Sequence, residues 1–405
     1  MKLSASKAAL LIILCFSLVP PLAAQHSSES ELRREAIALT KKGEAVAAKP
    51  LLEKLVQTYP DDFEILDCLA MVLLNHAATL NDPGERKKER VRAYQIAKKA
   101  RDVGNSKYGY WQVVLEIPED GSDLSFSANE KAEQLMKAAE ADFAKGDLEK
   151  AFSGYLSALA LEPKLYYAAL FCGDVRYKQG RHEEAWPWFE RATQIDPNIE
   201  TAHRYWADSL LAAGKLEQAR LKAIDAVVAD PYKQWTWNAL VSWSRRAGVQ
   251  MRHADVRSPN NFQQQQGGKM TINIDPSTLN QKDGREKWLV YEISRAAWSA
   301  NDYKLFKEAY PNEKQYRHSL EEEARALRLV ASTISDGLKK GEIKDLHPSL
   351  QPLIRLHNAG LLEAFVLFAR ADEGIAKDYL PYKEKNAAKL RQYLEEWVAP
   401  LPEKR

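Results

Sequence analysis

The sequence has little cysteine, with three residues among 405. Cys15 lies in the N-terminal segment, so only Cys68 and Cys172 remain for the body of the chain. Both lie within helix-forming stretches, which excludes a disulfide framework and predicts two small buried side chains. The fold must therefore depend on the burial of apolar surface.

The chain also lacks an excess of charge of either sign. It has 58 Lys and Arg residues against 56 Asp and Glu residues, for a formal net charge of +2. A nearly neutral chain has no extended attraction for a phosphate backbone, so nucleic acid is not predicted as a partner. One basic run, residues 86–92, is either a solvated helix face or a docking segment.

Motifs of catalysis and metal binding are absent from the sequence as well. None of the eight histidines has the H-E-x-x-H spacing, no glycine-rich loop carries the Lys and Ser or Thr of a phosphate site, and no Ser lies in a G-x-S-x-G turn. We therefore predict no catalytic residue, no metal site and no cofactor, although a catalytic triad need not be contiguous in sequence.

Long hydrophobic runs are limited to the N-terminus, at residues 8–19. Lys2 and Lys7 precede this run, and small residues follow it up to Ala24. A positive start, an apolar centre and a small-residue exit are typical of a secretory signal peptide, with cleavage expected after Ala24. Residues 1–24 are therefore predicted to direct the protein to the periplasm or out of the cell.

The same run is too short to cross a bilayer comfortably, and Pro20 and Pro21 interrupt it. No membrane span is therefore predicted for the mature chain. Attachment of a lipid at Cys15 is a weaker alternative, because Leu14 stands where a small residue would be expected.

Repetition is the clearest feature of the sequence, in residues 132–233. One module is written three times at a spacing of 34 residues, without insertion or deletion. This spacing is typical of stacked helix-turn-helix repeats. The repeated positions are three glycines, three alanines and three prolines, namely Gly146, Gly180 and Gly214; Ala151, Ala185 and Ala219; and Pro163, Pro197 and Pro231.

Each repeated residue type has a structural reason. A glycine adopts the left-handed conformation that ends a helix without steric cost. A small alanine lets two antiparallel helices approach closely where they cross, and a proline ends the second helix. Because one helix pair cannot bury its apolar side alone, neighbouring pairs must stack into a curved solenoid.

The pattern resembles the tetratricopeptide repeat (TPR) family, which has a small residue at position 8, Gly at 15, Ala at 20, an aromatic residue at 24, Ala at 27 and Pro at 32. The resemblance implies an all-α solenoid with a concave face that serves as a protein-interaction scaffold. The fold by itself names no partner. The middle copy has all of these residues, namely Gly173, Gly180, Ala185, Phe189, Ala192 and Pro197.

The rest of the chain is divided around these repeats. A capping helix follows the third copy, and Trp235, Trp237 and Trp243 would cover the open end of the stack. The C-terminal part is helical but resembles no family. The predicted divisions are a signal peptide at residues 1–24, two TPR-like repeats at 29–106 with an insertion at 80–92, a β-hairpin-like connector at 107–131, three TPR repeats and the capping helix at 132–248, a linker with a short strand at 249–282, and a helical C-terminal domain at 283–405.

Short β segments are predicted in the two connecting regions. Apolar residues alternate with others at residues 113–117 and again at 124–127, on either side of a turn, which predicts two short strands. A third alternation at residues 270–274 predicts a further strand. We expect this strand to pair with residues 124–127.

The TPR resemblance also implies which residues line the concave face. In this family, positions 2, 5, 9, 12 and 13 of each first helix point into the peptide-binding groove. These positions are Glu133, Met136, Glu140, Phe143 and Ala144 in the first copy, Tyr167, Leu170, Asp174, Tyr177 and Lys178 in the second, and Thr201, Arg204, Asp208, Leu211 and Ala212 in the third.

Stacking places residues of the same repeat position in rows along that face. A peptide laid across the rows would find carboxylates for its amides or basic side chains, and rings for its apolar side chains. The predicted rows are an acidic row of Glu140, Asp174 and Asp208 and, one turn away, an apolar row of Phe143, Tyr177 and Leu211.

Two alternatives bear on this prediction. Arg176 and Arg204 could neutralise the acids and leave an ordinary solvated surface. The family's clamp for acidic peptide tails uses Lys, Arg and Asn at these positions, so such a ligand is not expected here. We predict a scaffold for protein or peptide partners that is not an enzyme; the alternative is an envelope enzyme or glycan-binding factor acting through the C-terminal helices.

Overall fold

Helices account for nearly all regular structure in the computed structural model, which describes residues 22–108, 118–122, 125–233, 235–264, 270–279, 281–300 and 303–401. This confirms the predicted all-α fold with short β segments. The apolar run of the predicted signal peptide and the predicted strand at residues 113–117 lie outside the described residues. The chain divides into two compact units, residues 1–100 with 117–122 and residues 101–116 with 123–405.

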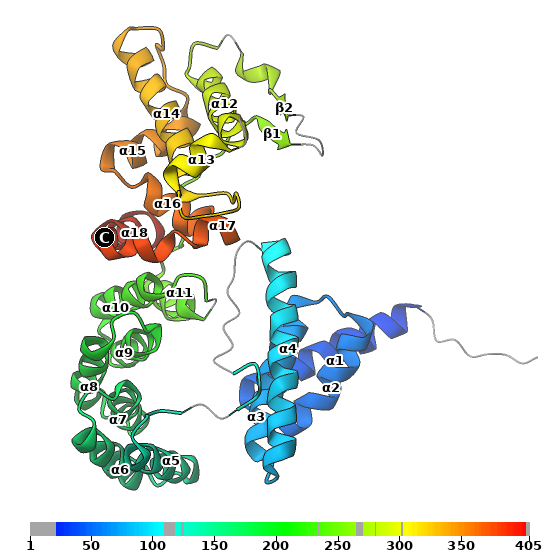
Figure 1. Cartoon of the computed structure of the whole chain (residues 1–405), viewed down its shortest axis with the longest axis vertical. Helices are drawn as coiled ribbons and strands as arrows, with labels where there is room; N and C mark the ends of the chain where they lie inside the picture. The colour runs from blue at the N-terminus through cyan, green and yellow to red at the C-terminus, as the bar shows by residue number, and fades with distance from the viewer. Residues whose placement is uncertain are drawn as a thin grey trace, which may run out of the picture. The chain divides into compact units, whose positions relative to one another are not determined.

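The first unit contains four helices, which Figure 1 draws in blue and cyan. Small buried residues hold the predicted repeat register, because Ala36, Ala48, Ala93 and Ala97 have no exposed surface. Gly43 has a φ of 77° and forms the corner between the first two helices. The helices are α1 (Leu22–Lys42), α2 (Ala45–Thr58), α3 (Phe63–Thr79) and α4 (Pro83–Tyr108).

The insertion predicted at residues 80–92 is mostly helix, since Pro83 begins α4. Its basic run is a helix face rather than a free segment. Arg92 forms an ion pair of 2.6 Å with Glu53 of α2. Lys49 of α2 contacts Glu89, which lies within the run. The run therefore helps to hold α4 against α2.

In the second unit, helices α5 to α10 form three antiparallel pairs that follow one another in an arc, with α5, α7 and α9 on its inner side (Figure 1). Gly146, Gly180 and Gly214 form the corners within the pairs at φ values of 86°, 73° and 76°, as predicted. The helices are α5 (Glu130–Lys145), α6 (Leu148–Leu161), α7 (Tyr166–Lys178), α8 (His182–Ile195), α9 (Glu200–Ala212), α10 (Leu216–Ala229) and the predicted capping helix α11 (Thr236–Ala247).

After α11 the chain runs extended to a short hairpin and then becomes helical. Ser319 caps the N-terminus of the longest of these helices, accepting a hydrogen bond of 3.3 Å from Glu322 N. The elements are β1 (Asn261–Gln264), β2 (Met270–Asn273), η1 (Pro276–Thr278), η2 (Arg285–Lys287), α12 (Trp288–Ser299), α13 (Lys304–Ala309), α14 (Leu320–Lys339), η3 (Pro348–Leu350), α15 (Gln351–Ala359), α16 (Leu362–Ala369), α17 (Glu373–Ala376), α18 (Tyr379–Tyr393) and the π-helical turn η4 (Leu394–Val398).

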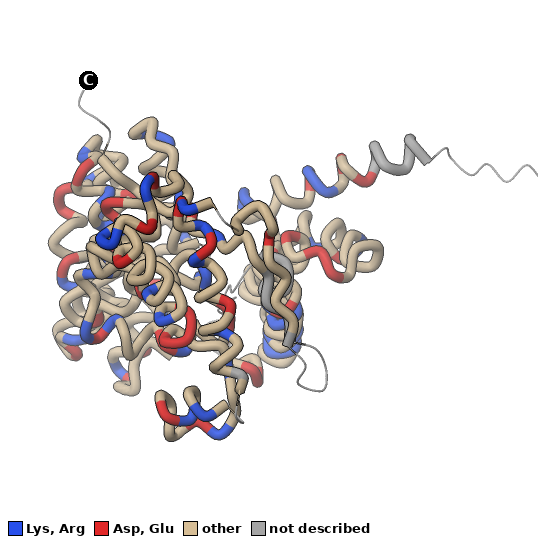
Figure 2. Tube along the Cα trace, turned by 90° about the horizontal axis from the view of Figure 1, so that it is seen from above, with Lys and Arg blue, Asp and Glu red and all other residues tan. Residues whose placement is uncertain are grey.

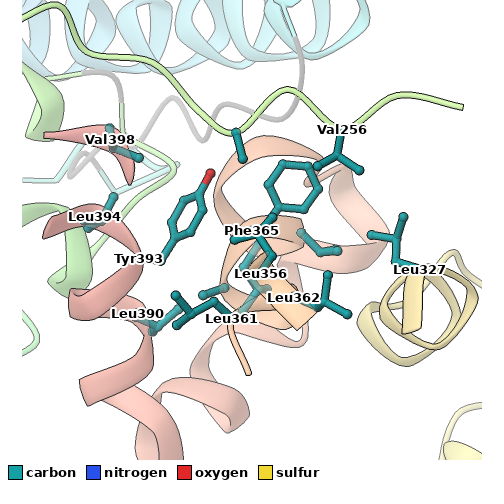
Figure 3. Close-up of a cluster of buried hydrophobic side chains, with 14 of the residues drawn as sticks. Val256, Leu327, Leu356, Leu361, Leu362, Phe365, Leu390, Tyr393, Leu394 and Val398 are labelled. Carbon is teal, nitrogen blue, oxygen red and sulfur yellow. The ribbon is translucent and has the colours of Figure 1, made fainter. Parts of the chain in front are cut away.

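One hydrophobic core joins the last repeat to the C-terminal helices, and this differs from the predicted division at residues 248 and 283. The core contains Ile224 and Val227 of α10, Trp243 of α11 and residues of α14 to α18. Figure 3 shows side chains of α14, α16 and α18 converging under Val256 of the extended segment. The C-terminal helices thus share a cluster of buried apolar side chains with the last repeat.

Hydrogen bonds between side chains and backbone reinforce this junction. The Arg220 guanidinium of α10 donates to Ala399 O at 2.6 Å and to Glu395 O at 2.8 Å. In the opposite direction, Lys383 Nζ of α18 donates to Ala229 O at 2.9 Å. These contacts cover the end of the stack that the sequence assigned to three tryptophans, of which Trp243 is fully buried.

The strand pairing differs from the prediction. The strand predicted at residues 270–274 exists as β2, but it pairs antiparallel with β1, within what was predicted to be a linker. Residues 125–127, the described part of the other predicted strand, are not in a strand. The alternation of apolar residues identified β2 correctly, but its partner is β1, which is close to it in sequence.

Charged residues of both signs are interspersed along the described chain, as Figure 2 shows. Among the described residues, no single helix has the length and apolar character needed to cross a membrane; a bent pair, Pro348–Ala359 with Leu362–Ala369, reaches both only across a bend of 119°. Leu353 and Leu356 of this pair are fully buried in the core described above.

Candidate peptide-binding face

The inner face is defined here as the side chains that α5, α7 and α9 present at the predicted groove positions. Each of these helices begins a repeat and ends near a glycine or alanine corner, so residues 34 apart fall at equivalent places. The face therefore repeats its chemistry along the arc, and each helix contributes one set of side chains.

The predicted acidic row is present. Glu140, Asp174 and Asp208 are half-buried on successive inner helices. Burial raises the pKa of all three carboxyl groups, and the charge of Asp174 raises that of Glu140 further. The row is thus a set of carboxylates that lack full hydration.

The alternative, that Arg176 and Arg204 neutralise the acidic row, requires two cations beside it, and the structure has fewer. Arg176 points elsewhere: it donates to Glu149 at 2.8 Å and lies over the ring of Phe152. Arg204 is engaged with Glu200 at 3.1 Å, although its charge lowers the pKa of Asp208. Arg176 therefore does not neutralise the row, and Arg204 acts on it only indirectly.

Lys178 is the cation that approaches the acids most directly. Its Nζ lies 3.8 Å from Asp174 Oδ2 and 3.8 Å from the centre of the Phe143 ring. Almost half of its side chain remains exposed, at 48%, so the pair is well screened by water. Lys178 thereby joins the acidic row to the apolar row and leaves both accessible.

Two residues predicted to line the groove are instead in the core. Met136 has no exposed surface, and Leu170 has 1%. Position 5 therefore lies in the core in the first two copies, whereas Arg204, at the same position of the third copy, is half-buried. The remaining predicted residues are half-buried or exposed, namely Glu133, Glu140, Phe143, Ala144, Tyr167, Asp174, Tyr177, Lys178, Thr201, Arg204, Asp208, Leu211 and Ala212.

A segment of the chain itself, residues 125–129, already covers the first part of this face. Phe126 packs edge-on against Tyr167 and Phe171, with ring centres 5.7 and 5.9 Å apart. Glu133 Oε2 accepts hydrogen bonds from the backbone N–H groups of Phe126 at 2.8 Å and Ser127 at 3.0 Å. The α5 end of the face thus holds a segment of the chain itself through one carboxylate and an aromatic cluster.

Sequence reasoning missed this segment and the residues beneath the row. Phe126 was assigned to a strand, so its docking was not considered. Tyr155 of α6 is not one of the predicted groove residues, yet its hydroxyl donates to Glu140 Oε1. Phe171 lies at position 6, outside the family's groove positions. A cluster of rings at residues 166, 167 and 171 was the available signal.

Histidine and cysteine offer no alternative site here. In the described ranges, no three His, Cys, Asp or Glu side chains are arranged to hold a metal ion. His203 is buried, which lowers its pKa to about 4, and Pro197 O lies 3.1 Å from its Nε2. Cys172 is buried, Cys68 is half-buried, and both are free thiols. The inner face remains the best candidate for function.

No family model and no curated protein matches the chain. Similar solved structures are TPR proteins, as the sequence resemblance predicted. The first TPR of Spaghetti (RPAP3) bound to an HSP90 peptide is 16% identical with a TM-score of 0.29, and the match covers 31% of this chain and 98% of that chain. The Sgt2 TPR domain from Aspergillus fumigatus is 19% identical with a TM-score of 0.28, and the match covers 31% of this chain and 84% of that chain. A thermophilic TPR protein of Thermus thermophilus is 21% identical with a TM-score of 0.24, and the match covers 54% of this chain and 97% of that chain.

Proposed function

We propose that this chain is a protein-interaction scaffold whose inner face binds an extended peptide segment with basic and apolar side chains. The observation that carries the proposal is the acidic row. Glu140, Asp174 and Asp208 are partly dehydrated carboxylates, and a cationic side chain of a ligand would compensate the cost of that dehydration. Tyr177 and Leu211 stand beside the row for apolar side chains.

The chain's own residues 125–129 support a peptide ligand on this face. They use a carboxylate for backbone N–H groups and rings for an aromatic side chain, which is the chemistry proposed for the rest of the face. Because Glu133 and Tyr167 are engaged with this segment, the ligand is expected on α7 and α9. Asp174 and Tyr177 are then the central contacts.

The test is a double variant, Asp174→Asn with Tyr177→Leu, compared with Glu183→Gln on the exposed side of α8. Binding of a synthetic Lys- and Leu-rich extended peptide should weaken by about tenfold or more in the double variant, which corresponds to ~1.4 kcal/mol. The wild-type affinity should also fall with added salt. Unchanged affinity in a folded double variant, shown by an intact far-UV spectrum, rules out this face.

Acid should weaken the same interaction. Folded-state pKa values raised above the ordinary 3.8 and 4.5 mean that the carboxylates of the row take up protons at a higher pH than free carboxyl groups. Affinity for the basic peptide is therefore expected to begin falling above pH 4.5 as the pH is lowered. An affinity that stays constant down to pH 4 contradicts the role of the row.

The location proposed for this scaffold is the periplasm or the cell exterior. The support is the order of charged, apolar and small residues in residues 1–24. Cell fractionation with N-terminal sequencing tests it, and the mature chain should begin at Gln25. A cytoplasmic protein that retains Met1 contradicts the proposal. The glycan-binding or enzymatic alternative for the C-terminal helices stays a prediction.

A further inference from the structure

A cavity of about 590 Å³ lies in the C-terminal region, in a part of the second unit remote in sequence from the inner face. One wall is the extended segment at residues 250–255. The opposite walls are the start of α15, with Pro352 and Arg355, and the turn η4, with Trp397. A volume of this size lies in the range of small-molecule sites.

The charges around the cavity are unevenly matched. Asp255 pairs with Arg257 at 2.7 Å, whereas Glu396 accepts a hydrogen bond of 2.9 Å from the neutral amide of Gln392 and keeps its charge. Its two arginines, Arg252 and Arg355, have no carboxylate within ion-pair distance among the residues that the structure describes. Counting Arg257, the arginines at this cavity therefore outnumber its carboxylates by one, and Arg252 and Arg355 are exposed to an incoming ligand.

An aromatic surface lies beside one of these arginines. The guanidinium of Arg355 is 4.6 Å from the centre of the Trp397 ring, which orients the group while leaving its N–H donors available. Pro352 and Pro400 add apolar surface to the same walls. The site thus combines a fixed cation with a flat apolar surface.

His253 also lines this cavity and contributes a neutral polar group. Burial lowers its pKa to about 4, and its Nδ1 lies 3.0 Å from the Tyr393 hydroxyl. Its ring stacks on Tyr393 with centres 6.0 Å apart, so it is held in place. The positive charge of the cavity therefore comes from the arginines.

A second cavity, of about 650 Å³, lies along the same extended segment but is less suited to an anion. Its Arg370 is engaged with Glu323 and with Val256 O, and its Arg257 is paired with Asp255. Only Arg252, which lines both cavities, lacks a carboxylate partner there among the described residues. The comparison singles out the cavity at Trp397.

We propose that the cavity between residues 250–255, α15 and η4 binds a small organic anion with a planar apolar body. The carboxylate or phosphate of this ligand pairs with Arg252 and Arg355, whose N–H donors match such groups. The planar body lies against Trp397 and the two prolines. This site is independent of the peptide-binding face.

The test uses indole-3-carboxylate and phenyl phosphate as probes, with indole-3-carboxamide as the uncharged match. Binding to the full chain is followed by titration calorimetry and by the indole N–H resonances of the ten tryptophans, with that of Trp397 identified from Trp397→Phe. The carboxylate should bind saturably, shift the Trp397 resonance and bind at least tenfold more tightly than the carboxamide. Comparison of the two anions separates carboxylate from phosphate sources.

The matched variants are Arg252→Gln with Arg355→Gln against Arg245→Gln with Arg246→Gln, two exposed cations of α11. The first pair should weaken the anion at least tenfold, and the second pair should leave it unchanged. Equal binding of carboxylate and carboxamide, equal loss in both pairs, or no saturable binding of either anion overturns the proposal. Trp397→Leu adds a second variant that keeps both arginines and should weaken only the planar probes, not inorganic phosphate.

Discussion

Arg220→Met tests whether the C-terminal helices belong to the solenoid core. Arg220 is 5% exposed and spans from α10 to the end of η4, where its guanidinium donates to Ala399 O and Glu395 O. Each charge-assisted hydrogen bond contributes ~1.5–3 kcal/mol. Burial lowers the pKa of Arg220, which reflects the cost of dehydrating its charge. The substitution removes this cost as well, and this offsets part of the loss of the two hydrogen bonds. The free energy of unfolding should therefore fall by ~2–4 kcal/mol.

The assay is urea denaturation followed by circular dichroism, with hydrogen exchange resolved by segment. Arg245→Met, an exposed arginine on α11, is the control and should change stability by less than ~0.5 kcal/mol. In Arg220→Met, α10 and α18 should lose exchange protection together, because they share one core. A loss of protection in α18 alone, or no loss of stability, refutes the shared core.

Three further results are expected. Gly173→Ala should lower the free energy of unfolding by ~1–2 kcal/mol in urea denaturation, because the new Cβ would lie 2.5 Å from Phe189 Cε1 and the strain exceeds the gain in helix propensity. A more stable variant contradicts this packing. Burial opposes the charge of His318, but its hydrogen bond to Asp372 and the carboxylate of Glu323, 3.5 Å from its Nε2, outweigh burial and raise its pKa to about 9. The resulting stability, at most ~3 kcal/mol, is complete below pH 6.5 and is lost as the pH rises through 9; His318→Asn should flatten this pH profile of unfolding free energy. Phe126→Ala should release residues 125–129 and strengthen binding of the basic peptide, as measured by calorimetry, whereas weaker binding would make this segment part of the site.

The repeat architecture could be predicted because its constraints are local. A corner that needs positive φ selects glycine, so Gly146, Gly180 and Gly214 mark the corners without knowledge of the rest of the chain. Ala151 and Ala185 similarly mark close helix crossings, where both are fully buried. Such signals repeat at one spacing, which multiplies their weight.

The junction with the C-terminal helices could not be predicted from the same pattern. Ile224 and Val227 read as ordinary repeat positions, and nothing in their spacing indicates that helices more than a hundred residues later will cover them. The partner of β2 was misassigned because alternation identifies a strand but not its neighbour. Non-local pairing is a property of the whole chain.

The repeat pattern predicted where the acidic residues of the candidate face lie, but it did not predict which positions of the face are buried. The positions of Asp174 and Asp208 follow from the repeat, but the burial of Met136 and Leu170 depends on how closely adjacent helices approach. The position of Phe126 depends on a connector that carries no repeat signal. Family positions alone could not separate lining residues from core residues.

The capped end of the array restricts how this protein can evolve. A chain of identical modules ordinarily gains or loses a module by unequal recombination at any boundary. Here the outer side of α10 is matched to one particular tail through Arg220, Lys383 and Tyr232, the last bonded to Leu367 O. Duplications should therefore survive upstream of α9, where one 34-residue unit resembles the next, whereas an added module after α11 would separate the tail from its only complementary surface among the described helices.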